Sequence, residues 1–372
     1  MEFEFLDIDN ISNEDIEQKV DFLKKDLLDE YQQPHSYPWV VGFSGGKDST
    51  LVLQFVVEML LDLAPNDRRR EVHVVANDTL VESPLVIKYL DKMLNKLSNA
   101  VETLQLPVKI VKTSPTIDQT FWVNLIGRGY PPPNRNFRWC TDRMKISPTS
   151  EYIKATISDH DQVILLLGVR REESAKRAES VNRYSNGSRL NKHNDLKGCM
   201  VYRPIVDFTT DEVWQILLQR RPPWGGTHRE LISLYKNAQG GECPLIIDKS
   251  QAPSCGTSSS RFGCWTCTVV AKDKSMEGFI EAGYGHLAPL LDFRDWLSEI
   301  RDNPTKRMAH RRGGVLTFMS NGTLIPGPFT FETRQEILHR LLTIQNEIGE
   351  QLISDEEIEI IKKIWAEDAQ IS

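Results

Sequence analysis

Short apolar runs alternate with longer segments of helical periodicity along the first half of the chain. Four runs rich in valine, isoleucine and leucine predict strands, at 39–43, 72–76, 108–111 and 163–167. Apolar residues spaced three and four apart predict helices, at 12–33, at 48–63 and from Ser83-Pro84 and Ser147-Pro148 onward. Strands that alternate with helices indicate a parallel sheet with helices on both faces. We therefore predict an α/β fold with a doubly wound parallel sheet over about 37–207.

The second half of the chain shows a different pattern. Residues 209–220 and most of 273–372 have helical periodicity, whereas 182–198 is polar and is expected to form a surface loop or flap. The segment 240–270 contains four cysteines and few periodic signals, so something other than a hydrophobic core is expected to order it. We divide the chain into an N-terminal helix, an α/β domain, a cysteine-rich region and a helical C-terminal region, at 1–36, 37–239, 240–272 and 273–372.

The composition is that of an ordinary globular protein, with 372 residues, 40% hydrophobic residues and a formal net charge of -7. This charge argues against nonspecific nucleic-acid binding over the whole surface. No stretch approaches the roughly 20 apolar residues that span a bilayer, and the acidic start does not resemble a signal peptide. We expect a cytoplasmic protein without a membrane partner, whose cysteines are reduced, metal-bound or catalytic.

A glycine pair joins the first predicted strand to the next helix, in Ser44-Gly45-Gly46-Lys47-Asp48-Ser49. Backbone N–H groups in such a turn converge on an anion at the helix N-terminus, while Lys47 adds charge and the two serines add hydroxyls. Asp48 suits a Mg²⁺ ligand, because Mg²⁺ binds through phosphates and one or two carboxylates. The Walker A pattern is not met, since Asp48 follows Gly46-Lys47. A plain strand-to-helix turn is the alternative explanation.

This segment resembles the PP-loop of ATP pyrophosphatases, which cleave ATP between the α and β phosphates. The resemblance implies that Ser44, Gly45, Gly46, Lys47, Asp48 and Ser49 bind ATP with Mg²⁺, and that Lys47 and Asp48 are catalytic. It also implies that Asp78, at the end of the second predicted strand, lies near the adenosine. A strand-end turn explains Asp78 equally well.

Gly168, Arg170 and Arg177 follow the fourth predicted strand. Glycine lets the backbone approach a ligand, and the two arginines can grip an anionic group through bidentate hydrogen bonds. The stretch resembles the Gly-x-Arg-x-x-Glu-Ser-x-x-Arg segment of phosphoadenylyl-sulfate and adenylyl-sulfate reductases, which places Gly168 at the nucleotide and makes Arg170 and Arg177 catalytic candidates. Residues 202–209 resemble the same family's Pro-Ile-x-x-Trp-Thr segment. A charged helix start with intrahelical ion pairs is the alternative.

Cys264 and Cys267 form a C-x-x-C pair, and Cys255 precedes them by nine positions. Thiolates at this spacing can hold an iron–sulfur cluster or a structural zinc, and free or redox-active thiols are a third possibility. The segment around Cys140 resembles the Cys-Cys-x-x-x-Lys site of adenylyl-sulfate reductases, with Trp139 in place of one cysteine. That resemblance implies a 4Fe-4S cluster held by Cys140, Cys255, Cys264 and Cys267, with Cys243 as an alternative ligand or a sulfur relay.

Residues 261–270, 273–276, 120–124 and 129–131 narrow the resemblance, which covers about 11–319, to the sulfurtransferases of bacterial DNA phosphorothioation. The resemblance implies that the chain adenylates an acceptor, the DNA phosphate backbone, and releases pyrophosphate before sulfur is incorporated. It implies a cysteine desulfurase as sulfur donor and other phosphorothioation proteins, DndD- and DndE-like, as partners. No cysteine follows Cys267, so the C-terminal catalytic cysteine of the reductases is missing and their mechanism is not expected.

A basic segment offers candidate contacts to DNA phosphates, at Arg307, Arg311 and Arg312. A solvated charge run is the commoner meaning of such a segment, and we expect DNA to be held through the complex. Two other enzymes remain alternatives, an adenylyl-sulfate reductase-like oxidoreductase and a tRNA thiolase. An alternative of another class is a nucleotide-sensing iron–sulfur assembly subunit without catalytic activity.

Overall fold

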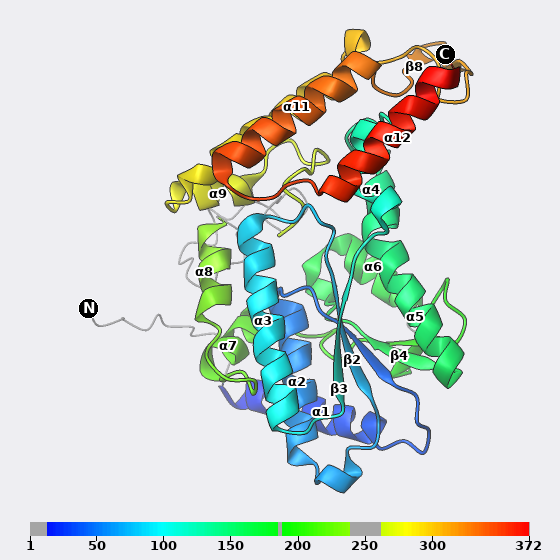
Figure 1. The fold of residues 1–372 in the computed structure, drawn as a ribbon. Coiled ribbons are helices and arrows are strands. Elements are labelled where there is room, and N and C mark those ends of the chain that lie inside the picture. The colour runs from blue at the N-terminus through cyan, green and yellow to red at the C-terminus, as the bar shows by residue number, and fades with distance from the viewer. Residues whose placement is uncertain (1–12, 185–187, 239–261, 372) are drawn as a thin grey trace. The chain divides into compact units, whose positions relative to one another are not determined.

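The computed structural model describes residues 13–184, 188–238 and 262–371, shown as a coloured ribbon in Figure 1. The chain forms two compact units, each assembled from three separate segments. Unit 1 comprises Met1–Ala76, Lys92–Val111 and Ile153–Arg229, and unit 2 comprises Asn77–Asp91, Lys112–Tyr152 and Glu230–Ser372. The domain boundaries expected from the sequence stay a prediction.

A six-stranded, mostly parallel sheet confirms the predicted α/β fold. Its strand order is β3-β2-β1-β4-β6-β5. The strands are β1 (Trp39–Gly42), β2 (Val72–Asn77), β3 (Val108–Thr113), β4 (Val163–Leu166), β5 (Leu190–Lys192) and β6 (Cys199–Tyr202). Strand β1 runs parallel to β2 and β4, and β4 runs parallel to β6, whereas β5 is an antiparallel edge strand. All four strands predicted from the sequence are therefore present.

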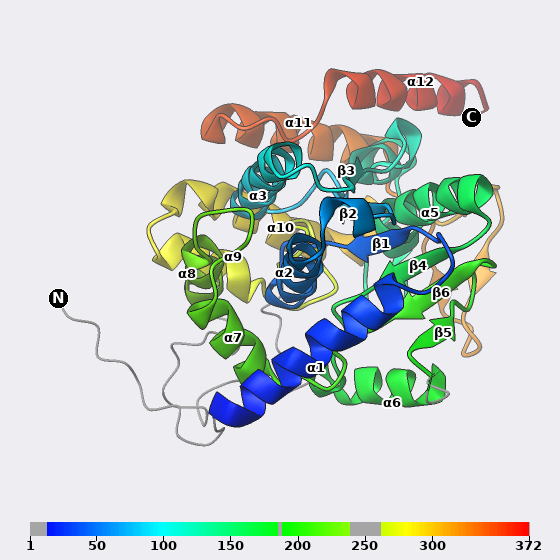
Figure 2. The same cartoon turned by 90° about the horizontal axis from the view of Figure 1, so that it is seen from below.

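Helices cover both faces of this sheet, as Figure 2 shows with α2 and α3 on one face and α5 on the other. The helices of this part of the chain are α1 (Asn13–Tyr31), α2 (Lys47–Asp62), α3 (Pro84–Thr103), α5 (Ser147–His160), α6 (Ala175–Tyr184) and α7 (Thr210–Gln219). Helix α7 begins with a capping box, in which Thr209 and Glu212 bond each other's backbone N–H. The central strands are fully buried because both faces are covered, which explains their continuous apolar sequences.

The expectation of a loop over 182–198 is wrong in part. Helix α6 extends to Tyr184, and β5 lies within the polar segment. The sequence also did not predict β6, which continues the sheet beside β4. The three-residue strand β5 is too short to show an apolar alternation, and the preceding Arg189 forms an ion pair with Asp26 of α1, at 2.7 Å.

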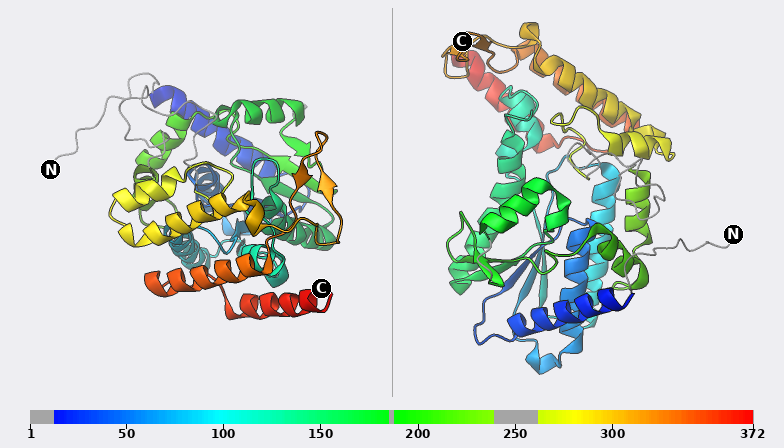
Figure 3. Two further views of the ribbon diagram at one scale, coloured as in Figure 1. Left: turned by 90° about the horizontal axis from the view of Figure 1, so that it is seen from above. Right: turned by 180° about the vertical axis from the view of Figure 1, so that it is seen from behind.

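The helical C-terminal region predicted from the sequence over 273–372 is confirmed. It contains α9 (Lys274–Glu281), α10 (Ala288–Arg301), α11 (Phe331–Ile348) and α12 (Asp355–Ile371), and a further helix, α8 (Arg229–Asn237), precedes it in the chain. A two-stranded ribbon, β7 (Thr317–Phe318) and β8 (Leu324–Ile325), precedes α11 and is drawn in orange in the left view of Figure 3. Trp122, Trp265 and Phe293 lie in the hydrophobic core of unit 2.

Among the described residues, no helix has the length and the apolar character that crossing a membrane requires.

The buried imidazole of His228 makes the stability of the fold depend on pH. Its Nε2 lies 2.8 Å from Oε1 of Gln54 on α2, and burial lowers the pKa of His228 from 6.5 to about 4. The unfolded chain therefore takes up this proton first as the pH falls. The stabilisation is complete above pH 6.5 and is lost as the pH falls to about 4.

We predict that this residue lowers the free energy of unfolding by up to roughly 3 kcal/mol between neutral and acidic pH. Denaturant unfolding of the wild type and of His228→Gln over this pH range measures the effect. The variant should lose less stability on acidification than the wild type. Equal pH dependence in the two proteins would contradict the prediction.

Candidate functional site

The predicted phosphate loop is a tight turn between β1 and α2. Gly45 has a φ of +73°, which favours glycine, and Gly46 is the N-cap of α2 without a side-chain cap. The hydroxyls of Ser44 and Ser49 lie 3.1 Å apart, and Ser49 Oγ donates to the Gly46 carbonyl at 3.0 Å. The two serines thus brace the loop internally, and the first N–H groups of α2 have no side-chain cap, as an anion site requires.

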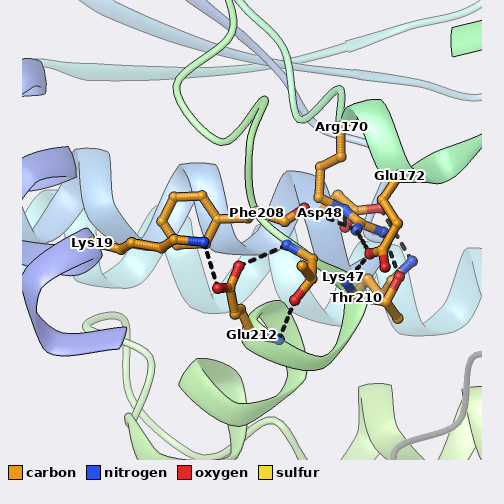
Figure 4. Close-up of polar contacts among 9 residues, drawn as sticks. Lys19, Lys47, Asp48, Arg170, Glu172, Phe208, Thr210 and Glu212 are labelled. Carbon is orange, nitrogen blue, oxygen red and sulfur yellow. Dashed lines mark hydrogen bonds and ion pairs between the residues drawn. The ribbon is translucent and has the colours of Figure 1, made fainter. Parts of the chain in front are cut away.

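Arg170 follows the carboxyl end of β4 and contacts this loop. Figure 4 shows its side chain beside that of Asp48. Its side chain is fully buried, and its Nε donates to Oδ1 of Asp48 at 2.7 Å. The other Asp48 oxygen lies 3.2 Å from Nζ of Lys47. The remaining guanidinium nitrogens of Arg170 bond Glu172, the carbonyl of Phe208 and the hydroxyl of Thr210.

Arg170 is fully buried and its guanidinium nitrogens bond four groups of the protein, so the side chain positions Asp48. The anion grip expected from the sequence stays a prediction. Removing one partner of a buried ion pair typically costs about 3–5 kcal/mol, because the other charge is left without compensation. The catalytic roles of Arg170 and of Arg177, which lies on α6, stay predictions.

Gly168 lies against the phosphate loop itself. A Cβ at this position would come within 2.8 Å of the Asp48 carbonyl carbon and 2.9 Å of the Ser49 nitrogen. Glycine was expected here to let the backbone approach a ligand, and it does permit a close approach, to the first turn of α2. The absence of a side chain at Gly168 therefore allows the phosphate loop to pack at this distance.

Asp78 follows β2 and belongs to unit 2. Its Oδ1 accepts a hydrogen bond from the Leu80 N–H at 2.8 Å, and its Oδ2 lies 3.0 Å from Nζ of Lys112. These contacts are those of a strand-end turn. The role of Asp78 near an adenosine stays a prediction.

The C-x-x-C segment is fixed in unit 2 by backbone and arginine contacts. The Trp265 N–H donates to the Val81 carbonyl at 3.0 Å, and Cys264 forms a β-bridge with Glu82. The buried Arg294 of α10 donates to the carbonyls of the segment that follows, at Cys267, Val270 and Ala271. The segment therefore needs little regular secondary structure to hold its cysteines in place.

Cys140 lies in α4 (Trp139–Thr141), directly before a π-helical turn at Asp142–Ile146. The sequence predicted a helix starting at Ser147-Pro148, but helical turns already begin at Trp139. Pro148 has no N–H to donate to the Met144 carbonyl, which accepts from Nδ2 of Asn77 at 2.9 Å instead. Wide turns of this kind are frequent at functional sites.

Cys140, Cys264 and Cys267 line one cavity of about 420 Å³. Burial raises the pKa of Cys140 and of Cys264, and the Cys264 thiolate strongly raises the pKa of Lys145. Nζ of Lys145 also lies 3.7 Å from Oε1 of Glu82. Lys145 thus places a positive charge beside three thiols.

The cavity supplies donors that fit an iron–sulfur cluster. Among the described residues, no group of three or more His, Cys, Asp or Glu side chains is arranged to hold a metal ion. A cluster makes a different demand, since each cysteine binds its own iron and the thiols surround the cluster instead of converging on one point. Cys243 and Cys255 lie outside the described residues, so the ligand set stays a prediction. Cys199 is buried in β6.

Several residues beside these sites were not singled out from the sequence. Glu172 and Thr210 bond Arg170, and Thr79 Oγ1 lies 3.3 Å from the Cys264 Sγ. Thr210 directly follows the reductase-like segment 202–209, and Thr79 follows Asp78 at the end of β2. The only sequence feature that could have pointed to these residues is their position next to a recognised motif.

The basic segment does not expose all three of the arginines proposed to contact DNA. The guanidinium of Arg307 donates to three backbone carbonyls, those of Arg301, Pro326 and Gly327. Arg311 and Arg312 are exposed, and Arg312 pairs with Asp368 at 2.6 Å. Arg307 therefore serves the loop's own structure, and contacts of these arginines with DNA stay a prediction.

Comparison with known proteins agrees with the class that the fold defines, an α/β protein with a mostly parallel sheet and a glycine turn between β1 and α2. Residues 38–270 match the model of the phosphoadenosine phosphosulfate reductase domain. The chain belongs to this family.

Two relatives are uncharacterized proteins of Methanocaldococcus jannaschii. They are 25% and 26% identical to the chain over 187 and 179 residues, which are 50% and 48% of the chain. The chain covers only 32% and 35% of the length of these relatives.

Similar solved structures are more distant. The phosphoadenylyl-sulfate reductase of Candida auris in a phosphate complex has 12% identity and a TM-score of 0.34, covering 56% of this chain and 87% of that one. The U34-tRNA thiolase NcsA of Methanococcus maripaludis with its [4Fe-4S] cluster has 13% identity and a TM-score of 0.35, covering 76% and 80%.

Gly168→Ala tests the packing of β4 against the phosphate loop. The added Cβ meets backbone atoms of Asp48 and Ser49, so the loop must shift. We predict a loss of about 1–3 kcal/mol in the free energy of unfolding and at least a tenfold (~10×) weaker affinity for ATP, a shift of about 1.4 kcal/mol.

Denaturant unfolding and calorimetric titration with ATP measure the two effects. Gly285→Ala is the matched control, because its added Cβ meets nothing within 4 Å. Wild-type affinity in Gly168→Ala would show that the loop position does not govern nucleotide binding.

Proposed function

We propose that the chain is an ATP-dependent sulfurtransferase of the DndC type, which adenylates the DNA phosphate backbone and releases pyrophosphate for phosphorothioate modification. The observation that carries the proposal is the Asp48 carboxylate, held between Lys47 and the buried Arg170 at the start of α2. A turn that only joined a strand to a helix would not need a buried arginine to fix its aspartate. Membership of the reductase-domain family is consistent with a nucleotide at this loop.

The loop residues would act on the phosphates of ATP. The N–H groups at the start of α2 and the ammonium of Lys47 stabilise negative charge on the β and γ phosphates. Bound Mg²⁺ would neutralise further phosphate charge, and Asp48 is the carboxylate placed to hold it. Arg170 keeps Asp48 in one orientation, so little reorganisation is needed when the nucleotide binds.

Adenylation converts an oxygen of the DNA phosphate, which is a poor leaving group, into part of AMP, which is a good one. A DNA phosphate oxygen attacks the α phosphorus of ATP, the bond between the α phosphorus and the bridging oxygen breaks, and pyrophosphate leaves. The acceptor oxygen then belongs to AMP, and a sulfur nucleophile can displace it at the DNA phosphorus. We propose that a cysteine desulfurase supplies this sulfur. Cys140, Cys264 and Cys267, with Cys255, would hold the iron–sulfur cluster, and Cys243 is an alternative ligand or sulfur relay.

DNA would be held through a complex with DndD- and DndE-like partners. In the basic segment, Arg311 and Arg312 are both exposed, and Arg312 pairs with Asp368, while the guanidinium of Arg307 bonds backbone carbonyls of its own loop. Exposed apolar side chains follow this segment and suit a protein interface better than a phosphate backbone, at Val315, Leu316, Phe318 and Met319. Two exposed arginines, one of them already paired with Asp368, provide few phosphate contacts, which supports the shared binding of DNA.

Sulfur transfer from labelled cysteine into DNA tests this function. The complete system contains the chain, a cysteine desulfurase, the partner proteins, ATP, Mg²⁺ and DNA. We predict that Asp48→Asn lowers incorporation of sulfur-35 into DNA by roughly 100-fold or more, because the carboxylate charge beside the phosphates is lost while its shape is kept.

Asp62→Asn is the matched control, since Asp62 is an exposed carboxylate at the opposite end of the same helix. It should leave incorporation unchanged. Circular dichroism and thermal unfolding check that Asp48→Asn is folded. Incorporation that continues without ATP, or at the wild-type rate in folded Asp48→Asn, would refute the proposed function.

A further inference from the structure

Three buried hydroxyls line the cysteine cavity without any hydrogen-bond partner. Ser83, Thr266 and Ser275 are 5%, 1% and 6% exposed, and their hydroxyl oxygens make no hydrogen bond in the described structure. All three residues line the same cavity as Cys140, Cys264 and Cys267. They come from three separate elements, the start of α3, the C-x-x-C loop and the first turn of α9.

The absence of partners is energetically unfavourable at each position. A buried hydroxyl without a partner costs about 1–3 kcal/mol, and most such groups in folded proteins are paired. Ser83 precedes a helix and Ser275 lies in the first turn of another, where serine hydroxyls commonly accept a backbone N–H. Neither does so here, and Asp273 caps α9 instead by accepting from the Met276 N–H at 3.0 Å.

Thr268, close to Thr266 in the sequence, has a buried hydroxyl that does form a hydrogen bond. Thr268 is as buried as the three orphaned residues, at 4% exposed. Its hydroxyl donates to the Pro133 carbonyl at 2.6 Å. The segment can therefore pair a buried hydroxyl with backbone, whereas the hydroxyl of Thr266, which lines the cavity, is left unpaired.

We propose that Ser83, Thr266 and Ser275 donate hydrogen bonds to the sulfur atoms of the cluster and so raise its reduction potential. The inference rests on the proposed cluster in this cavity and deepens it. Sulfur atoms of a cluster and of its cysteine ligands accept hydrogen bonds, and such bonds are one of the determinants of cluster potential. They stabilise the reduced state most, because it carries more negative charge.

The first measurement is the iron and sulfide content of the anaerobically purified chain, with Cys264→Ser and Cys199→Ala beside it. Cys264 lines the cavity, whereas Cys199 is buried in β6 and does not. Cys264→Ser should lose the iron and Cys199→Ala should keep it. A wild-type chain without iron would overturn both the proposed cluster and this inference.

The second measurement is a spectroscopic redox titration of Ser83→Ala, Thr266→Val and Ser275→Ala. Each variant should keep its iron and titrate at a more negative potential than the wild type. Thr266→Ser retains the hydroxyl and should restore the wild-type potential. Thr268→Val is the matched control, because its hydroxyl bonds backbone and does not face the cavity, so its potential should not move.

Stability of the iron-free chain gives a readout independent of the cluster. Removing an unpaired buried hydroxyl should leave its unfolding midpoint unchanged or raised, whereas Thr268→Val should lower it. Iron-loaded variants with wild-type potentials would overturn this inference alone and leave the proposed cluster standing. An equal shift in Thr268→Val would also overturn it, because the effect would then be general to the segment.

Discussion

One buried guanidinium, that of Arg170, ties the phosphate loop to the elements that follow β4 and β6. It bonds Asp48 in the loop, Glu172 after β4, and the carbonyl of Phe208 and hydroxyl of Thr210 at the start of α7. Gly168 allows this arrangement, because any side chain there would meet the loop backbone. The candidate nucleotide site therefore depends on an ion pair and a close contact between segments more than 100 residues apart, since Arg170 and Asp48 are separated by 122 positions.

The cysteine cavity of unit 2 is ordered by the same kind of long-range contact. Arg294 bonds three carbonyls around the C-x-x-C segment, and Trp265 packs in the core beside Trp122 and Phe293. Regular hydrogen-bonded structure is scarce in this segment, and a buried arginine replaces it. Three residues that line the cavity, Ser83, Thr266 and Ser275, have hydroxyls without a hydrogen-bond partner.

Local patterns in the sequence were sufficient for the fold. Apolar runs predicted the four strands, and the glycine pair before Lys47 and Asp48 predicted the turn between β1 and α2. The sequence did not predict strand β5, because three residues, Leu190-Asn191-Lys192, are too few to show an apolar alternation. The sequence also did not predict that Arg170 bonds Asp48. An arginine after a strand suggests a ligand contact, and its partners within the protein are distant in sequence. Tertiary packing decides whether a hydroxyl is paired, as in Thr268, or unpaired, as in Ser83, and no local sequence pattern predicts it.

Identifying which bond of ATP is cleaved tests most directly the central claim that the chain adenylates its acceptor. The complete system, with DNA and the sulfur donor, can be supplied with ATP labelled in the α phosphate or in the γ phosphate, and the products separated. Cleavage at the loop between the α and β phosphates predicts AMP and pyrophosphate in equal amounts, in step with sulfur incorporation. ADP and inorganic phosphate as the products, with sulfur still entering the DNA, would contradict adenylation of the acceptor by this chain.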